Sequence, residues 1–109
     1  MPLSLPTPVS TYFRISNGES AGERIADVFT PDATVHDEGR SWQGINAIDG
    51  RQRAARAKFD YVVEPLEATA DGERLVVATR VSGNFPGSPV RLDHVFSLDG
   101  DRIRTLEIS

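Results

Sequence analysis

The stretch Ala33-Thr34-Val35-His36-Asp37 alternates apolar and polar residues directly after a Thr-Pro-Asp break. The alternation predicts a short strand in which Ala33, Val35 and Asp37 share one face, and the two apolar residues mark that face as the core side. Asp37 would then point into the interior or into a cavity, where a carboxylate needs partners or takes a raised pKa. In the alternative interpretation the strand ends one residue earlier, and Asp37 opens a turn with the residues that follow.

Length and composition indicate a single globular domain. The 109 residues fit one domain, and the hydrophobic share of 39% and charged share of 26% are typical of globular proteins. No apolar run approaches the roughly 20 residues of a membrane helix. The start, residues 1–6, lacks the basic and apolar regions of a signal peptide. We therefore expect one domain over residues 1–109, extended at residues 1–6, in the cytoplasm and away from membranes.

The charges and the lack of cysteine argue against several classes of function. A net charge of −4 argues against a nucleic-acid partner, and the basic cluster at residues 51–58 lacks interleaved aromatic residues, as is typical of a solvated helix face. Without cysteine there is no disulfide, thiolate metal site or thiol nucleophile. The histidines at positions 36 and 94 show no metal-ligand spacing. We expect neither a metal nor a cofactor.

The first sixty residues predict three helices. Thr7-Pro8 is typical of a helix start, an apolar stripe follows it, and Asn17-Gly18 ends the helix. Ser20-Ala21-Gly22-Glu23 has the spacing of a capping box and opens a second helix, which Pro31 ends. The third helix runs from Ile45 to about Lys58 with a weak apolar stripe, so we expect it to lie over a sheet edge or a cavity mouth.

After residue 59 the pattern changes from helix to strand. Four runs, at residues 59–70, 74–85, 90–98 and 102–108, are separated by turn sequences. Runs at this regular spacing predict an antiparallel meander. Together with the strand that carries Asp37, which a polar loop follows, they predict an α+β protein whose helices lie on one face of a curved sheet.

The run at residues 90–98 has two informative faces. Its even-numbered residues, Leu92 to Leu98, are the more apolar set, and as the core face they would leave Asp93 in solvent. A sheet covered on both faces would allow Asp93 to face a pocket instead. The pattern leaves these alternatives open. Apolar residues on both faces of the run at 74–84 favour burial on both sides, and so predict a homodimer through the convex face.

Three motifs carry a resemblance to a known superfamily. They are Phe29-Thr30-Pro31-Asp32-Ala33-Thr34-Val35-His36-Asp37, Gly44 with Ala47-Ile48, and Asp93-His94-Val95-Phe96-Ser97-Leu98-Asp99-Gly100-Asp101-Arg102-Ile103. With the order of elements, they resemble the nuclear transport factor 2-like superfamily, which includes ketosteroid isomerases and SnoaL-like polyketide cyclases. The resemblance implies a cone-shaped curved antiparallel sheet wrapped around the N-terminal helices, a cystatin-like α+β roll, with a small-molecule pocket in the cone.

The resemblance to ketosteroid isomerase implies three catalytic residues. That family carries a tyrosine in the first helix, an aspartate base that ends the first strand, and a protonated aspartate in an Asp-His-aromatic segment. These roles fall on Tyr12, Asp37 and Asp93. Asp37 would remove a proton from a carbon next to a carbonyl, and the other two would donate hydrogen bonds to the enolate oxygen. This requires Asp93 to face the concave side beside Tyr12. The implied pocket wall contains Val35, Trp42, Arg51, Val95, Leu106 and Ile108.

Two departures from the family bear on the ligand. Arg51 and Gln52 stand where the family has aromatic residues in the pocket wall, and Glu38 stands where ketosteroid isomerases tend to have proline. A guanidinium in the pocket favours an acidic or highly oxygenated ligand over a steroid.

The leading function is cofactor-free proton transfer next to a carbonyl, by an isomerase or a cyclase. One alternative is a non-catalytic ligand-binding or dimerisation module of the same fold, in which Tyr12 and Trp42 are ordinary core residues. Another is an epoxide hydrolase or dehydratase, for which Arg91 and Asp93 lie two apart on one strand face. By strand parity we expect His36 on an outer face and His94 in a packing or interface role.

Overall fold

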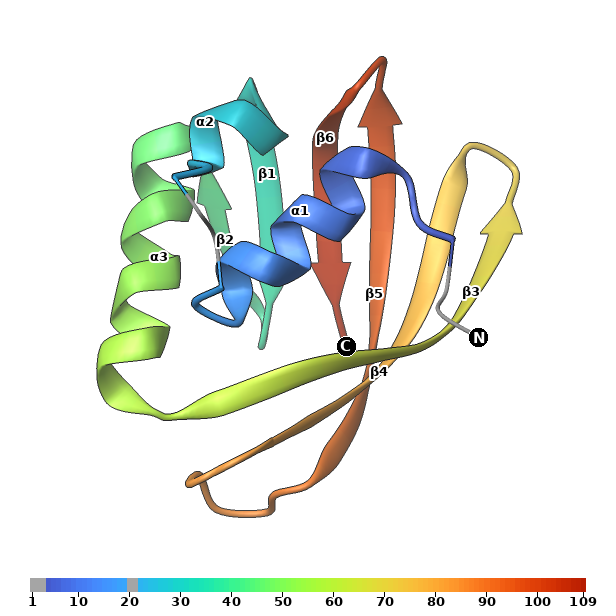
Figure 1. Cartoon of the computed structure of the whole chain (residues 1–109). Coiled ribbons are helices and arrows are strands. Elements are labelled where there is room, and N and C mark those ends of the chain that lie inside the picture. Colours follow the sequence, from blue (N-terminus) through green and yellow to red (C-terminus); the bar gives the residue numbers. More distant parts are fainter. Residues whose placement is uncertain (1–3, 20–21) are drawn as a thin grey trace.

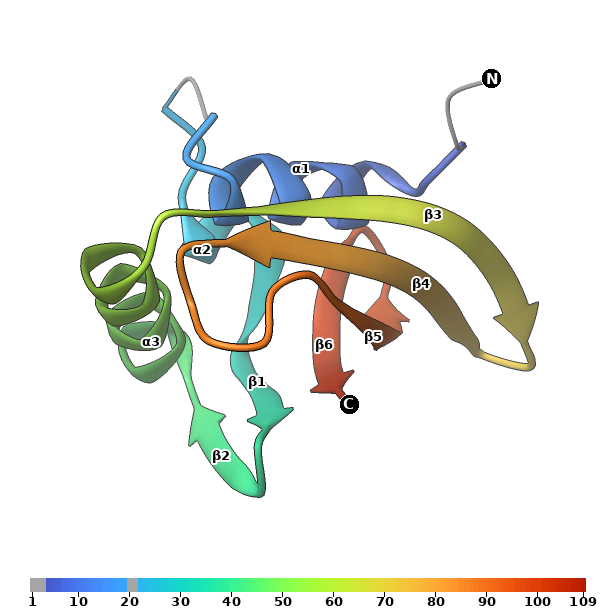
Figure 2. The same ribbon diagram turned by 90° about the horizontal axis from the view of Figure 1, so that it is seen from below.

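The computed structural model describes residues 4–19 and 22–109, which form three helices and one curled sheet of six strands (Figure 1). In chain order the elements are α1 (Thr7–Ser16), α2 (Ile25–Val28), β1 (Phe29–Asp37), β2 (Arg40–Gln43), α3 (Ile45–Lys58), β3 (Tyr61–Asp71), β4 (Arg74–Gly83), β5 (Val90–Asp99) and β6 (Arg102–Ile108). The helices lie on the concave side, where β3 and β4 curve past α1 (Figure 2). This confirms the predicted α+β fold with a curved sheet.

The strand order is β2-β1-β6-β5-β4-β3. Neighbouring strands pair antiparallel except β1 and β6, which run parallel with Val35 opposite Leu106 and Asp37 opposite Ile108. The sheet is thus antiparallel, as the resemblance implied, except at this one junction. The long connection through α3 and the meander permits a parallel pairing, which a hairpin could not. As a result β1 and β6 end at the same edge of the sheet.

A short edge strand, β2, lies where we expected a polar loop. It pairs with β1 through a two-residue turn at Glu38 and Gly39, whose φ angles of 53° and 75° are both positive, as in type I′ hairpins. Asp37 is the last residue of β1 and pairs with Arg40 across this turn. The first interpretation of Asp37 is therefore correct and the alternative is wrong, because the strand extends to Asp37 and the turn opens directly after it.

The second helix is much shorter than predicted. α2 is a single turn that begins after Arg24, and the strand β1 already starts at Phe29. The predicted capping box begins at residues outside the described ranges. Pro31 lies inside β1, where the pairing with β6 shifts register between Phe29 and Thr34. A proline is tolerated at such an irregularity because no ladder hydrogen bond needs its missing N–H.

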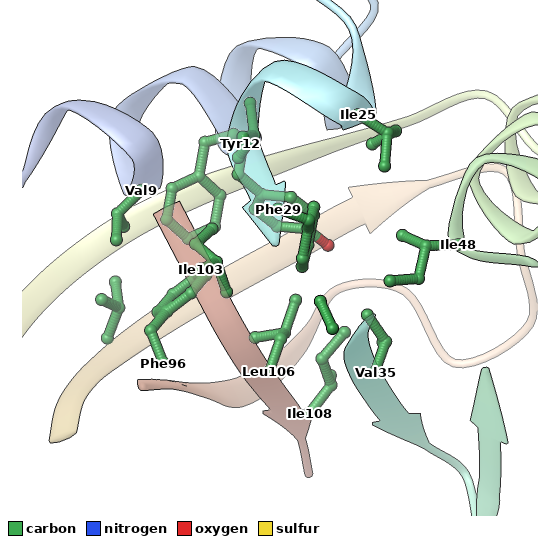
Figure 3. Close-up of a cluster of buried hydrophobic side chains, with 14 of the residues drawn as sticks. Val9, Tyr12, Ile25, Phe29, Val35, Ile48, Phe96, Ile103, Leu106 and Ile108 are labelled. Atoms are coloured by element: carbon green, nitrogen blue, oxygen red, sulfur yellow. The ribbon is translucent and has the colours of Figure 1, made fainter. Parts of the chain in front are cut away.

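The core fills the space between α1, β1 and the inner face of β4 to β6. Val9, Tyr12 and Phe13 are the buried stripe of α1, as predicted, and the Tyr12 ring packs edge-on against Phe29 and Phe96 (Figure 3). Aromatic pairs in this geometry stabilise the fold beyond the area that they bury. In the described part of the chain, no helix is long and apolar enough to span a membrane.

Candidate functional site

A cavity of about 570 Å³ opens on the concave side of the sheet, between α3, the start of β3 and the loop at residues 84–89. Asp37 and Ile108, which end the parallel pair β1 and β6, reach it from the sheet edge, and Arg51 reaches it from α3. Phe59 and Phe85 stand at its mouth with their rings 6.0 Å apart. The third helix thus lies at a cavity mouth, as its weak apolar stripe predicted.

Arg51 and Asp37 form an ion pair in the cavity wall. Arg51 Nη2 donates to Asp37 Oδ2 at 2.7 Å, and the side chains are only 14% and 23% exposed. The guanidinium also lies over the Trp42 ring, 5.2 Å from its centroid, a cation–π arrangement. β1 directs Asp37 inward in register with the fully buried Ala33 and Val35, as the alternation predicted. The cavity therefore contains a partly desolvated charge pair.

Tyr12 is both a core residue and a cavity residue. It is 2% exposed, its ring packs in the core, and its hydroxyl oxygen points toward the side where α3 supplies Ile48 (Figure 3). The side chain also lines the cavity. Burial raises the pKa of Tyr12, and the positive charge of Arg51 partly offsets this rise. The hydroxyl therefore keeps its proton at neutral pH and can donate a hydrogen bond.

His94 occupies the concave side beside Tyr12. It is 3% exposed, and its ring centroid lies 6.3 Å from that of Tyr12 and 5.4 Å from that of Phe13. The packing role that the sequence suggested is therefore correct, but His94 also lines the cavity. Burial, with a smaller effect of the Arg51 charge, lowers the pKa of His94 to about 4. The imidazole is neutral near pH 7.

Asp93 is not at this site, and the expectation that it faces the concave side is wrong. Its side chain is exposed on the outer face of β5, and its backbone exchanges hydrogen bonds of 2.8 and 3.1 Å with Ser109. Val95 shares that outer face and pairs with Val76 and Glu107, so it does not line the cavity. The inner face of β5 carries the apolar set that begins at Leu92, which is the arrangement that hydrophobic alternation alone indicated.

Of the other predicted pocket residues, some line the cavity and some lie in the hydrophobic core. Trp42 and Ile108 line the cavity, whereas Val35 and Leu106 are fully buried in the core outside its lining. Arg91 is exposed, so the strand face that suggested an epoxide hydrolase lies outside the cavity. Exposed His36 contacts Ser41 at 2.8 Å, on the outer face as expected.

Gln52, which the resemblance placed in the pocket wall beside Arg51, lines the cavity, and so does Tyr61, which the sequence reasoning missed. Gln52 is 5% exposed, its Nε2 donates to the Tyr61 hydroxyl at 3.4 Å, and its Oε1 lies 3.5 Å from Arg51 Nη1. Its position four residues after buried Ile48 places both on one face of α3. Among the described residues, no group of three or more acidic or histidine side chains is arranged to hold a metal ion.

Comparisons with known proteins identify relatives over nearly the whole chain. Residues 9–105 match the model of the SnoaL-like domain. A crystal structure from Sinorhizobium meliloti, provisionally named as a polyketide cyclase, is 43% identical, with a TM-score of 0.89 over 96% of this chain and 95% of that one. A search of curated protein sequences found no significant match.

More distant structures share the fold. A ketosteroid isomerase-like protein from Catenulispora acidiphila, in complex with trimethylamine, is 17% identical, with a TM-score of 0.79 over 97% of this chain and 86% of that one. A protein from Agrobacterium tumefaciens, provisionally named as an isomerase of the SnoaL-like family, is 21% identical, with a TM-score of 0.76 over 94% of this chain and 92% of that one. At these identities the likeness concerns the fold alone.

Proposed function

The chain belongs to the SnoaL-like domain family, and from that premise we propose that it binds a small oxygenated molecule and catalyses cofactor-free proton transfer at a carbon next to a carbonyl, as an isomerase or a cyclase. The observation that carries this proposal is the ion pair of Arg51 and Asp37 in the wall of a 570 Å³ cavity. It supplies a carboxylate base and a cationic donor side by side.

Asp37 is the proton acceptor in this proposal. Its contact with Arg51 uses Oδ2, so we assign Oδ1 to receive the proton. The C–H bond next to the carbonyl breaks, its electron pair forms the enolate, and the proton passes to Oδ1. In an isomerase the substrate carries a second double bond beside this carbon, so the enolate is conjugated and Oδ1 returns a proton to its far carbon. The proton on Oδ1 can exchange with solvent before it returns. In a cyclase the enolate carbon instead attacks a second carbonyl of the same molecule, and the proton goes to the new alkoxide. No external oxidant or reductant is needed.

Arg51 and Tyr12 stabilise the negative charge that develops on the enolate oxygen. Both line the cavity, and Tyr12 carries a hydroxyl that stays protonated at neutral pH. Because Asp93 lies outside, Arg51 takes the place that the resemblance gave to a protonated aspartate. Donors preorganised in a partly dry site stabilise such an oxyanion far more than donors in water do.

The charge of Arg51 also selects the ligand. A ligand carboxylate or a pair of carbonyl oxygens can pair with the guanidinium in its planar, bidentate geometry. Aromatic side chains at the mouth, Phe59 and Phe85, suit an apolar part of the same molecule. Together these features favour a keto acid or polycarbonyl compound over a neutral steroid.

The experiment is deuterium exchange in D₂O, followed by NMR, with levulinate as a keto acid and cyclohexanone as a neutral ketone. We expect the protein to accelerate exchange of levulinate more, and Asp37→Asn to lower the catalysed rate by about 100-fold or more. Asp93→Asn is the matched control, because it removes a carboxylate of the same kind outside the cavity, and it should leave the rate unchanged. Equal rates in wild type and Asp37→Asn would exclude Asp37 as the base.

A non-catalytic binding module is the second candidate, and one observation favours it. Asp37 is already engaged by Arg51, whose guanidinium occupies its Oδ2. This candidate predicts no exchange of either probe above the buffer rate, together with levulinate binding that Arg51→Gln abolishes.

A further inference from the structure

His94 has one ring nitrogen fixed by a neighbour that the proposed proton transfer does not use. Its Nδ1 lies 3.3 Å from Thr79 Oγ1, inside the core on the concave face of the sheet. Thr79 is fully buried and sits on β4, next to the strand that carries His94. Because Nδ1 faces Thr79, the other nitrogen, Nε2, is the one available to the cavity that His94 lines.

The direction of the Thr79 hydroxyl decides which nitrogen carries the proton. Thr79 Oγ1 donates its single proton to the backbone carbonyl of Leu92 at 2.9 Å, the shorter of its two contacts. A hydroxyl has one proton to donate but can still accept through its oxygen. The Thr79 hydroxyl oxygen therefore accepts a hydrogen bond from His94, and this requires a proton on Nδ1 of the ring.

We infer that Thr79 fixes His94 as the Nδ1–H tautomer, so that Nε2 presents a bare lone pair to the cavity and selects ligands that carry a hydroxyl or enol O–H at that position. The hydrogen bond at one imidazole nitrogen sets the state of the other. Burial and the Arg51 charge lower the pKa of His94 to about 4, which supports a neutral ring at pH 7.

The cavity then offers two polar groups of opposite kind. Arg51 can only donate hydrogen bonds, and neutral His94 in this tautomer accepts one. A ligand that contacts both groups therefore pairs an anionic or carbonyl oxygen with a hydroxyl donor, as hydroxy acids and enolised dicarbonyl compounds do. The inference rests on the proposed function only in that it assumes a ligand in this cavity, and Thr79 acts in it as a positioning residue.

The first test is ¹⁵N NMR of the imidazole in the ligand-free protein at pH 7, in a His36→Gln background that removes the other histidine. We expect wild type and Thr79→Ser to show protonated Nδ1 and unprotonated Nε2. Thr79→Val removes the acceptor and should move the proton to Nε2. A protonated Nε2 in wild type, or a tautomer that Thr79→Val leaves unchanged, would overturn the assignment of Thr79. This spectrum is independent of any catalytic rate, so failure of the proton-transfer proposal in Asp37→Asn would leave it standing.

The second test measures binding of 3- and 4-hydroxybenzoate and of their methoxy counterparts by titration calorimetry. One hydroxybenzoate should bind about three- to tenfold more tightly than its counterpart to wild type and Thr79→Ser, the effect of one hydrogen bond. The ratio should fall to about one in Thr79→Val and in His94→Phe. A ratio of one in wild type, a ratio that the variants keep, or no binding of any benzoate would refute the selection of a hydroxyl donor.

Discussion

Arg51 and Asp37 place two charges where the protein gains little stability from them. Both side chains are more than three-quarters buried, and the desolvation cost of such a pair offsets most of its Coulomb attraction. A hydrophobic pair of similar volume would stabilise the fold as well. In the proposed function the charged pair in the cavity wall therefore serves ligand binding and not fold stability.

His94 makes stability depend on pH. Its pKa is about 4 in the folded protein and about 6.5 when exposed. Between these values the unfolded chain binds a proton that the folded protein does not, so stability falls as pH falls through this window. We expect a loss of about 2 kcal/mol between pH 7 and pH 4.5 from this residue. Urea unfolding of wild type and His94→Phe at both pH values measures it.

The control for this experiment is His36→Gln, which removes the exposed histidine. Its fall in stability between the two pH values should match that of wild type, whereas the fall in His94→Phe should be smaller by about 2 kcal/mol. The same fall in His94→Phe as in wild type would show that His94 does not titrate with a lowered pKa.

The strand face on which a single residue lies was predictable where the alternation of apolar and polar residues alone decides it. Asp37 followed from its alternation with Ala33 and Val35, and His36 followed from the same parity. The prediction for Asp93 was wrong because the resemblance placed its side chain on the concave face. The apolar alternation of Leu92 to Leu98 on the same strand indicated the opposite face. Burying that carboxylate would have required exposing Phe96, and hydrophobic burial outweighs a motif match.

At the scale of elements, short segments escaped prediction. β2 has four mostly polar residues and gains its order from the Glu38-Gly39 turn and from pairing with β1, which no local pattern encodes. α2 is one turn, held against its neighbours rather than by its own propensity. The third helix was long enough for its bounds, Ile45–Lys58, to be predicted.

Gly83 is the element-scale position that admits no side chain. A Cβ there would overlap the carbonyl oxygen of Asp60 and lie 2.8 Å from the Tyr61 Cα, because β3 and β4 approach closely at the cavity mouth. We expect Gly83→Ala to destabilise the protein by about 1–3 kcal/mol, as the strands must part. The measurement is the midpoint of urea unfolding.

Gly50 in α3 is the matched control for the same change. No atom lies within 4 Å of a Cβ built on it, so Gly50→Ala should stabilise the helix by about 0.5–1 kcal/mol. If both variants shift stability in the same direction, steric overlap at Gly83 is not the cause. The contrast separates crowding from the general effect of replacing glycine.

At the scale of the whole molecule, the parallel pairing of β1 with β6 determines where the site lies. The order of elements predicted a meander and helices on one face, but sequence separation gives no sign that the first strand joins the last. That long-range contact brings Asp37 beside Ile108, where Arg51 reaches it from α3. The sequence thus predicted which residues point inward, but it did not predict the pairing of β1 with β6 that brings them together.

The outer face of the sheet carries the last prediction, a homodimer. The helices lie on the concave side, so β4 and β5 present Val76 and Val95, paired directly across the strands, on the opposite face. Charges of both signs surround them, among them Arg80 and Asp93, and a twofold axis can match such a surface to itself. The mass of one chain is 11.9 kDa, and we expect sedimentation equilibrium at micromolar concentration to give twice that mass.

Val95→Arg should convert this dimer to a monomer, because two new cations would meet across the axis in an apolar centre. Arg53→Glu is the control: its side chain is 80% exposed on α3, away from that face, and it should leave the mass unchanged. A wild-type protein that sediments as a monomer would remove the convex face as an interface. The His94 tautomer and the Arg51–Asp37 pair would be unaffected, because every residue that forms them comes from one chain.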